Sequence, residues 1–153
     1  MTSSALTELL SYTREHAGPA SSRIHDFVAA YFDSTDPVEL VARGPAALFA
    51  SAKAHWRLLD TPRPVNTAKV HVFNPTLAQD GFVSDHTVVQ IVNDNMPFLV
   101  DSVTMAINRS NRTAHWIVHP LLSVARDAKG NVQSVTSAAS AAAAGRTDPV
   151  ESL

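Results

Sequence analysis

A cluster of amide and carboxylate side chains interrupts the most apolar part of the chain. In "VVQIVNDNMPFLVDSVTMAINRSN", residues 88–111, Asn93, Asp94 and Asn95 separate a β-branched run from Pro97 and a second apolar stripe. Oxygens of such side chains accept hydrogen bonds from the free N–H groups that begin a helix. The same N–H groups can instead hold the carboxylate of a small ligand such as an amino acid. The residues fit both interpretations.

Histidines offer a second kind of chemistry, because the chain has seven of them. His115 and His119 are four residues apart, a spacing that places two metal ligands on one face of a helix. The segment around them is β-branched and aromatic, and on a strand that spacing separates them by about 13 Å. Ser84, Asp85 and His86 are chain neighbours, whereas a catalytic triad combines distant segments. We therefore expect no catalytic residue and no metal site.

The composition describes a globular protein with few specialised partners. The 153 residues are 45% hydrophobic and 17% charged, with a formal charge of −2 and no cysteine. Such a chain forms a core, but it has no positive surface for nucleic acid or an anionic membrane. Without cysteine it has no disulfides or thiolate ligands, and we expect neither an export signal nor a membrane span, because no run approaches ~20 apolar residues and the first residues lack a basic region before an apolar segment. We expect a cytoplasmic protein with no nucleic-acid and no membrane partner.

Helices are expected in a subdomain that covers residues 1–60. The best stripe has apolar residues at helical spacing from Ile24 to Phe32. Asp36 and Pro37 form a typical helix start, and Gly44 should end that helix. A following helix should bury one stripe, which comprises Leu48, Phe49, Ala52, Trp56 and Leu59.

Beyond a proline-rich linker at residues 61–66, the apolar period changes from helix to strand. We expect a sheet with one helix over residues 67–136, with the chain ending before the fold closes. In residues 137–153 the alanines favour a helix, whereas the missing apolar face favours a loop of small residues, and we expect the loop. The expected strands are 68–73, a central strand 87–92 covered on both faces, and a long strand 114–127. The helix should run from about Phe98 to Arg109. Its expected buried stripe is Leu99, Val100, Val103, Ala106 and Ile107.

Two segments, "SDHTVVQIVNDNMPFLVDSVTMAINR" and "HWIVHPLLSVARDAKG", resemble the N-terminal region of the large bacterial NAD-specific glutamate dehydrogenases. That region carries an ACT-like domain of β-α-β-β-α-β type. The resemblance implies an α+β fold, in which the helical subdomain packs on a partial ACT-like (β-α-β-β) antiparallel sheet. The family's Rossmann domain and catalytic lysine lie far downstream, and the five glycines here are too scattered for a dinucleotide-binding loop. We expect no cofactor in this segment, with NAD bound elsewhere in the parent.

The resemblance also implies a role. The segment would regulate or assemble a dehydrogenase that deaminates L-glutamate to 2-oxoglutarate and ammonia. Its partners would be the rest of the parent and further copies, which would meet through an exposed sheet edge at residues 116–125. The alternative is a module that senses an amino acid at the turn. The candidate ligand-binding residues are Asn93, Asp94, Asn95, Met96, Phe98 and Asp101.

One residue departs from the pattern of ACT domains at this turn. Their first loop reads Asp-x-Pro-Gly, and the glycine allows the backbone to approach a ligand. Phe98 stands where that glycine would be. A side chain of this size would fill the ligand's pocket, so the departure favours the structural or assembly role.

Overall fold

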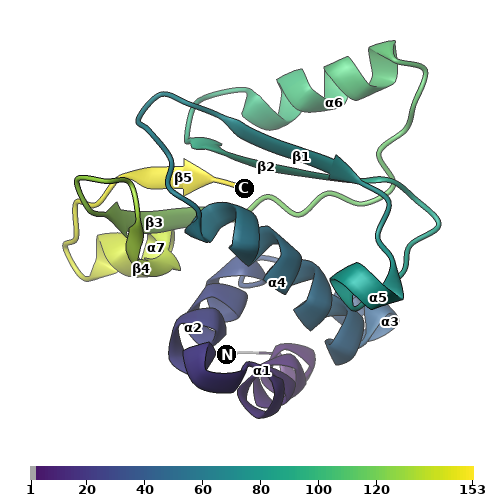
Figure 1. Ribbon diagram of the computed structural model, residues 1–153, viewed down its shortest axis with the longest axis horizontal. Helices are drawn as coiled ribbons and strands as arrows, with labels where there is room; N and C mark the ends of the chain where they lie inside the picture. Colours follow the sequence, from purple (N-terminus) through teal and green to yellow (C-terminus); the bar gives the residue numbers. More distant parts are fainter. Residues whose placement is uncertain (1–2) are drawn as a thin grey trace.

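N-terminal helices form one layer, and an antiparallel sheet packs on it, in the computed structural model, which describes residues 3–153 (Figure 1). This architecture confirms the predicted α+β class. Four α-helices and a short 3-10 turn build the helical layer: α1 (Ser4–His16), η1 (Gly18–Ala20), α2 (Ser21–Tyr31), α3 (Pro37–Arg43) and α4 (Pro45–Asp60).

Apolar stripes hold these helices together, as the sequence predicts. The stripe of α2 from Ile24 to Phe32 is buried, and it packs with α1 and α4 in one core. The predicted stripe of α4 is buried as well. At the start of α3 the carboxylate of Asp36 accepts the Val38 N–H at 2.8 Å. Gly44, with φ of 74°, separates α3 from α4.

Five strands form a sheet in the order β1-β2-β5-β3-β4, with every neighbouring pair antiparallel. From β2 onward the elements follow the order β-α-β-β-α-β, which is the order that the resemblance implies. The strands are β1 (Lys69–Phe73), β2 (Val88–Asp94), β3 (Leu121–Arg126), β4 (Val132–Ser137) and β5 (Val150–Ser152). Three further helices are α5 (Leu77–Asp80), α6 (Leu99–Arg109) and α7 (Ala138–Ala143).

The C-terminal residues correct the expectation of a loop. Residues 137–153 contain α7 and β5, because Ser137 caps the alanine-rich helix with its hydroxyl and β5 enters the sheet. β5 pairs with β2 on one side and with β3 on the other. The expected exposed edge over residues 116–125 is therefore wrong for β3, which has a strand on each side. The edge strands of this sheet are β1 and β4.

The predicted strand 114–127 is too long. Only Leu121–Arg126 forms β3, and residues 111–120 have no regular structure. The reason is that β5 has three residues and pairs with β3 only from Leu121 onward.

Helix α6 begins and ends close to the expected residues, but its environment differs from the prediction. The expected apolar stripe from Leu99 to Ile107 is not buried, and neither is any other residue of α6. β2 also differs from the expected strand, because Val92 and Gln90 are buried while Val89 on the opposite face is 44% exposed. The face of β2 that meets the helical layer is therefore covered more completely than the face of Val89 and Ile91.

Candidate functional site

In the turn between β2 and α6, the carboxylate of Asp94 contacts the buried Arg63 instead of the start of the helix. Asp94 accepts Arg63 Nη2 at 2.6 Å and the Asn66 N–H at 3.0 Å. The Arg63 guanidinium holds the pKa of the Asp94 carboxyl below its usual value, and the Asn66 N–H adds to the effect. The Asn95 N–H donates to Val150 O at 2.9 Å. The prediction that Asp94 or Asn95 caps α6 is therefore wrong.

Phe98 holds the position before α6 with a backbone that glycine usually supplies. Its φ is 62° and its ψ is 17°, which is the left-handed region, and its side chain is 77% exposed. A bulky residue rarely adopts this conformation. The turn thus keeps a glycine-like backbone, and the Phe98 ring points into solvent instead of filling a pocket.

Phe98→Gly is expected to stabilise the protein by about 1 kcal/mol, because glycine removes the cost of a left-handed phenylalanine and little buried surface is lost. Urea unfolding measures the change. As a control, Phe32→Gly should destabilise, because Phe32 is a buried core residue. A lower free energy of unfolding for Phe98→Gly would show that the ring packs against something.

The remaining predicted ligand residues do not converge. Asn93 is buried in β2, where its amide nitrogen lies 3.9 Å from the Met96 sulfur. Asp101 is exposed in the first turn of α6. Within residues 3–153 no side chain caps the start of α6, and the nearest carboxylate in its first turn is that of Asp101.

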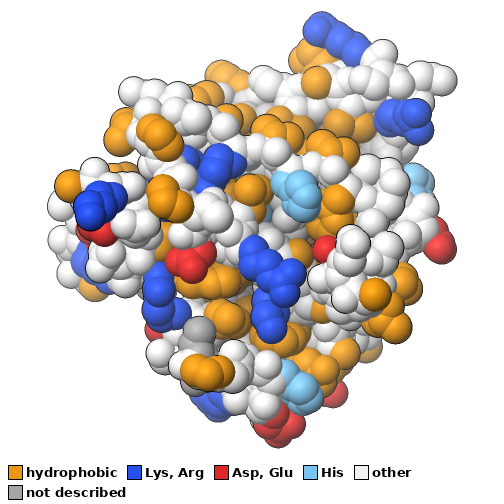
Figure 2. All heavy atoms as spheres, in the orientation of Figure 1, with side chains coloured by type: hydrophobic (Ala, Val, Ile, Leu, Met, Phe, Trp, Pro, Cys, Tyr) orange, Lys and Arg blue, Asp and Glu red, His pale blue; other side chains and the backbone are white. Residues whose placement is uncertain are grey.

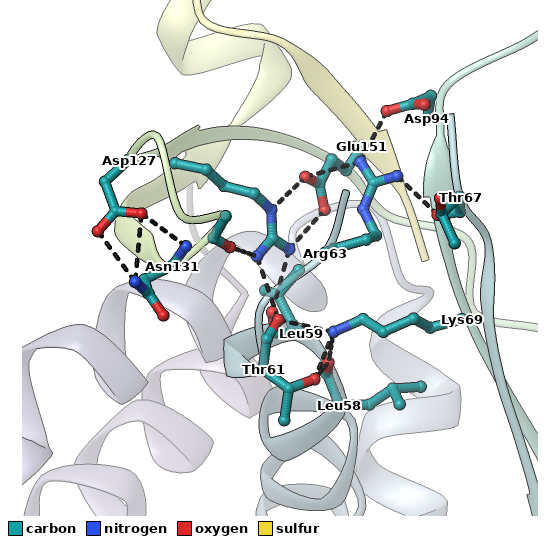
Figure 3. Close-up of polar contacts among 12 residues, drawn as sticks. Leu58, Leu59, Thr61, Arg63, Thr67, Lys69, Asp94, Asp127, Asn131 and Glu151 are labelled. Atoms are coloured by element: carbon teal, nitrogen blue, oxygen red, sulfur yellow. Dashed lines mark hydrogen bonds and ion pairs between the residues drawn. The ribbon is translucent and has the colours of Figure 1, made fainter. Parts of the chain in front are cut away.

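A network of buried charges joins β5 to the linker and to β3 (Figure 3). The side chain of Glu151 is 2% exposed, and its carboxylate accepts two bonds from Arg126, at 2.7 and 3.0 Å. Arg63 Nη2 lies 3.0 Å from the same carboxylate and 2.6 Å from Asp94. Arg126 also donates to the Leu59 carbonyl at 3.0 Å. Charges buried in this way are stable only when they are paired and hydrogen-bonded, so this network fixes β5 in the sheet.

Sequence reasoning missed this network. Arg63 lies in a segment that reads as a connector, and Glu151 lies in a tail that lacks an apolar pattern. No local spacing relates the two, because they are 88 positions apart. The available signal was weak: an arginine between two prolines, and a single carboxylate beside Val150.

Lys69, at the start of β1, lies beside this network and is half-buried. Its ammonium donates to the carbonyls of Leu58 at 2.5 Å and Thr61 at 2.7 Å, and to the Thr61 hydroxyl (Figure 3). These acceptors lie at the C-terminal end of α4, where a cation is favoured by the helix dipole. Burial, together with the nearby Arg126, lowers the pKa of Lys69 to about 8.

A buried histidine connects the helical layer to the sheet. His55 Nε2 donates to the Ile91 carbonyl at 2.9 Å, which leaves Nδ1 to accept the Tyr31 hydroxyl at 2.9 Å. Burial lowers the pKa of His55 to about 4, although the bond to Ile91 acts in the opposite direction. The neutral imidazole therefore fixes β2 against α4 and α2.

Acid should weaken this connection. The pKa of His55 is about 4 in the folded state and 6.5 in an ordinary environment, so between these values the unfolded chain binds a proton that the folded chain does not. The stability that depends on neutral His55 is complete above pH 6.5 and is lost as the pH falls towards 4. Urea unfolding from about pH 7 to pH 4.5 should show a steeper loss for the native sequence than for His55→Gln. Equal slopes would contradict this assignment.

A cavity of about 1200 Å³ lies between α4, β2, α6 and residues 110–119. Ile91 and Val89 line it from β2, and Leu99, Val103 and Ile107 line it from α6. Gln90 also lines it, and the side-chain oxygen of this buried residue has no hydrogen-bond partner among residues 3–153. None of the predicted ligand residues from Asn93 to Asp101 is among the residues that line the cavity.

Within residues 3–153 no three metal-binding side chains from histidine, aspartate or glutamate lie together as an ion site. No helix there has both the length and the apolar composition that crossing a bilayer requires.

The helical layer, the antiparallel sheet and the β-α-β-β-α-β order define an ACT-like α+β domain. The profile of the family described as "Glutamate dehydrogenase, ACT1 domain" matches residues 27–153. The chain belongs to this family.

Curated relatives agree with the assignment. The chain is 34% identical over 125 residues to the NAD-specific glutamate dehydrogenase of Pseudomonas aeruginosa. This alignment covers 79% of the chain and 8% of that protein. It is 30% identical over 117 residues to the NAD-specific glutamate dehydrogenase of Halomonas elongata. This second alignment covers 76% of the chain and 7% of that protein. The chain thus spans less than a tenth of the length of these relatives. No solved structure matches it.

Proposed function

We propose that the chain is a non-catalytic assembly and regulatory segment of an NAD-specific glutamate dehydrogenase. In this proposal the parent protein oxidises L-glutamate to 2-oxoglutarate and ammonia with NAD, and the groups for that chemistry lie outside this segment. The segment acts in the cytoplasm, where it positions the subunits or domains around it.

The apolar surface around α6 is the single observation that carries the proposal. Strand pairing places Val70, Val72, Val89 and Ile91 on one face of the sheet, and Val70 and Val72 are each 60% exposed. The apolar stripe of α6 is only partly covered. Figure 2 shows hydrophobic side chains on the side of the molecule that carries β1 and α6. Exposed apolar surface of this kind typically marks an interface with protein.

The position of β1 strengthens the argument. It is an edge strand with five residues and no proline, so one row of its backbone N–H and C=O groups is available to another strand. A second copy, or another part of the dehydrogenase, can pair with this edge and cover the apolar face. This edge replaces the one that the sequence predicts at residues 116–125.

Sedimentation velocity over a range of protein concentrations tests assembly. We expect dimers of the isolated chain, and we expect Val72→Lys to yield monomers, because Val72 is exposed on the β1 face and lysine protects strand edges. Val38→Lys is the matched control, since Val38 is exposed on α3, away from β1. A native chain that stays monomeric and does not bind the rest of the parent would contradict the proposal. So would glutamate-dependent reduction of NAD by the isolated chain.

A second candidate function is amino-acid sensing at the turn that precedes α6. The observation that favours it is the left-handed backbone of Phe98, which directs the ring away and leaves the start of α6 accessible. Thermal unfolding with a panel of amino acids distinguishes the two functions. A ligand at 100 times its dissociation constant adds about 2.7 kcal/mol of stability. If the turn senses an amino acid, that amino acid should raise the midpoint of thermal unfolding, and Asp101→Asn should reduce the increase while Asp33→Asn leaves it unchanged. If the segment serves assembly alone, no amino acid should change the midpoint.

A further inference from the structure

The half of β2 nearest its start has a neighbouring strand on one side only. β1 pairs with β2 along Val88–Val92, whereas β5 reaches only Asn93 and Asp94 on the other side. Figure 1 shows β5 ending, at the mark C, between β2 and the segment that leads into β3. The cavity described above occupies the space beyond that end, since Ser152 and Leu153 line it together with Val88–Ile91.

Along β2 the backbone N–H and C=O groups point alternately to one side of the strand and to the other, so the residues whose groups face this space can be identified. The Asn95 N–H donates to Val150 of β5, so the odd-numbered residues of β2 direct their backbone groups to the side of β5. The backbone N–H and C=O groups of Val89 and Ile91 therefore face the cavity. The Ile91 carbonyl accepts a hydrogen bond from His55. The Ile91 N–H and the N–H and C=O of Val89 have no backbone partner within residues 3–153.

The opposite wall is a segment with the composition of a strand. Residues 115–119, "HWIVH", are rich in β-branched and aromatic side chains but have no regular structure. They lead directly into β3. The end of β5 already bonds to the end of this wall and to the residue after it, because the Ser152 hydroxyl lies 2.5 Å from His119 Nε2 and the Leu153 N–H donates to Pro120 O at 3.3 Å.

We infer that this space, the β2 slot, is the docking site of an extended peptide strand that continues the line of β5. The strand runs antiparallel to β2 and bonds to Val89 and Ile91 on one edge, while its other edge faces residues 115–119. It is supplied by the same polypeptide beyond β5 in the longer proteins of this family, of which the matched region is 8% or less. The five residues Val88–Val92 define its length, which is about 16 Å.

The walls of the slot specify the side chains of this strand. When the docked strand pairs with β2, every second side chain of that strand lies on the same face of the sheet as Val89 and Ile91. The apolar stripe of α6, which is not buried, lines the cavity on this face. These positions require valine or isoleucine. The intervening residues face Gln90, whose buried side-chain oxygen has no partner in the described part of the chain, so a hydroxyl donor such as threonine fits there.

The backbone geometry favours a strand over a small apolar ligand. A ligand without a peptide backbone would leave the N–H groups of Val89 and Ile91 unpaired after it excluded water, which costs stability for each group. A strand satisfies both and extends the interface that β5 already makes. It also buries the stripe of α6 and gives residues 115–119 a partner.

Hydrogen exchange in chains extended at Leu153 tests the inference. One extension adds Val-Thr-Val-Thr-Val-Thr, and the control adds Pro-Thr-Pro-Thr-Val-Thr, in which prolines remove the first two N–H donors directed at β2. With the first extension, NMR should show the amides of Val89 and Ile91 exchanging at least tenfold more slowly than in the control, together with a higher midpoint of thermal unfolding.

Three outcomes would overturn the inference. The first is equal exchange at Val89 and Ile91 in the two extended chains. The second is protection that depends on protein concentration, which would assign the slot to a second copy. The third is a gain in stability that survives Val89→Pro, a change that removes the donor facing the slot and leaves the bonds to β1 intact. The test does not involve assembly through β1, so either proposal can fail while the other stands.

Discussion

Glu151→Gln is expected to lower the free energy of unfolding by about 3–5 kcal/mol, which is the largest effect that we predict for a single side chain. Glu151 is 1% exposed, and it is the carboxylate that Arg63 and Arg126 share. Glutamine keeps the shape but removes the charge, so two guanidiniums remain buried near each other with only Asp94 to balance them. The strand that carries Glu151 should then detach first. Urea unfolding measures the total loss, and hydrogen exchange of β5 locates it.

Asp60→Asn is the matched control for this prediction. It breaks an ion pair with Arg23 in which both side chains are more than 40% exposed. Exposed pairs contribute between 0 and about 1 kcal/mol, because water and salt screen them. Similar losses for Glu151→Gln and Asp60→Asn would contradict the view that burial gives the network its importance.

Gly130→Ala is expected to cost about 2–3 kcal/mol, the second largest effect, because two penalties combine. Gly130 has φ of 83°, a conformation that alanine adopts only with strain. An added Cβ would also lie 3.0 Å from the backbone nitrogen and oxygen of Arg63, which cannot move without disturbing the charge network. The Gly130 carbonyl itself accepts Arg126 Nη1 at 2.8 Å. Urea unfolding again supplies the measurement.

Gly145→Ala separates the two penalties. Gly145 has φ of 69°, but no atom of the residues that the structure describes lies within 4 Å of its added Cβ. Its substitution should therefore cost about 1 kcal/mol, from backbone strain alone. If Gly145→Ala proves as costly as Gly130→Ala, the close approach between Gly130 and Arg63 has no energetic role.

The helical layer could be predicted from sequence because its signals are local. Helical spacing from Ile24 to Phe32, the cap at Asp36 and the break at Gly44 each involve residues that are close in the chain. The structure agrees with them. The apolar period also located β1, β2 and α6, since periodicity indicates which elements form.

Periodicity does not indicate what covers an element. The stripe of α6 has a strong helical pattern, yet its burial depends on a surface that residues 3–153 do not provide. The end of the sheet was missed for a related reason. β5 has three residues, which is too short for a pattern, and a charge network holds it instead of an apolar stripe. The candidate turn was located correctly, but the pairing of Asp94 with Arg63 spans 31 positions and leaves no local signal.

The central claim is that other protein surface covers the apolar stripe of α6, and hydrogen exchange of the α6 amides tests this claim most directly. The comparison is between Leu99–Arg109 in the isolated chain and the same residues within a full-length dehydrogenase of this family. We predict strong protection of α6 in the full-length protein and rapid exchange in the isolated chain. Equally rapid exchange in both would contradict the claim that this surface serves assembly.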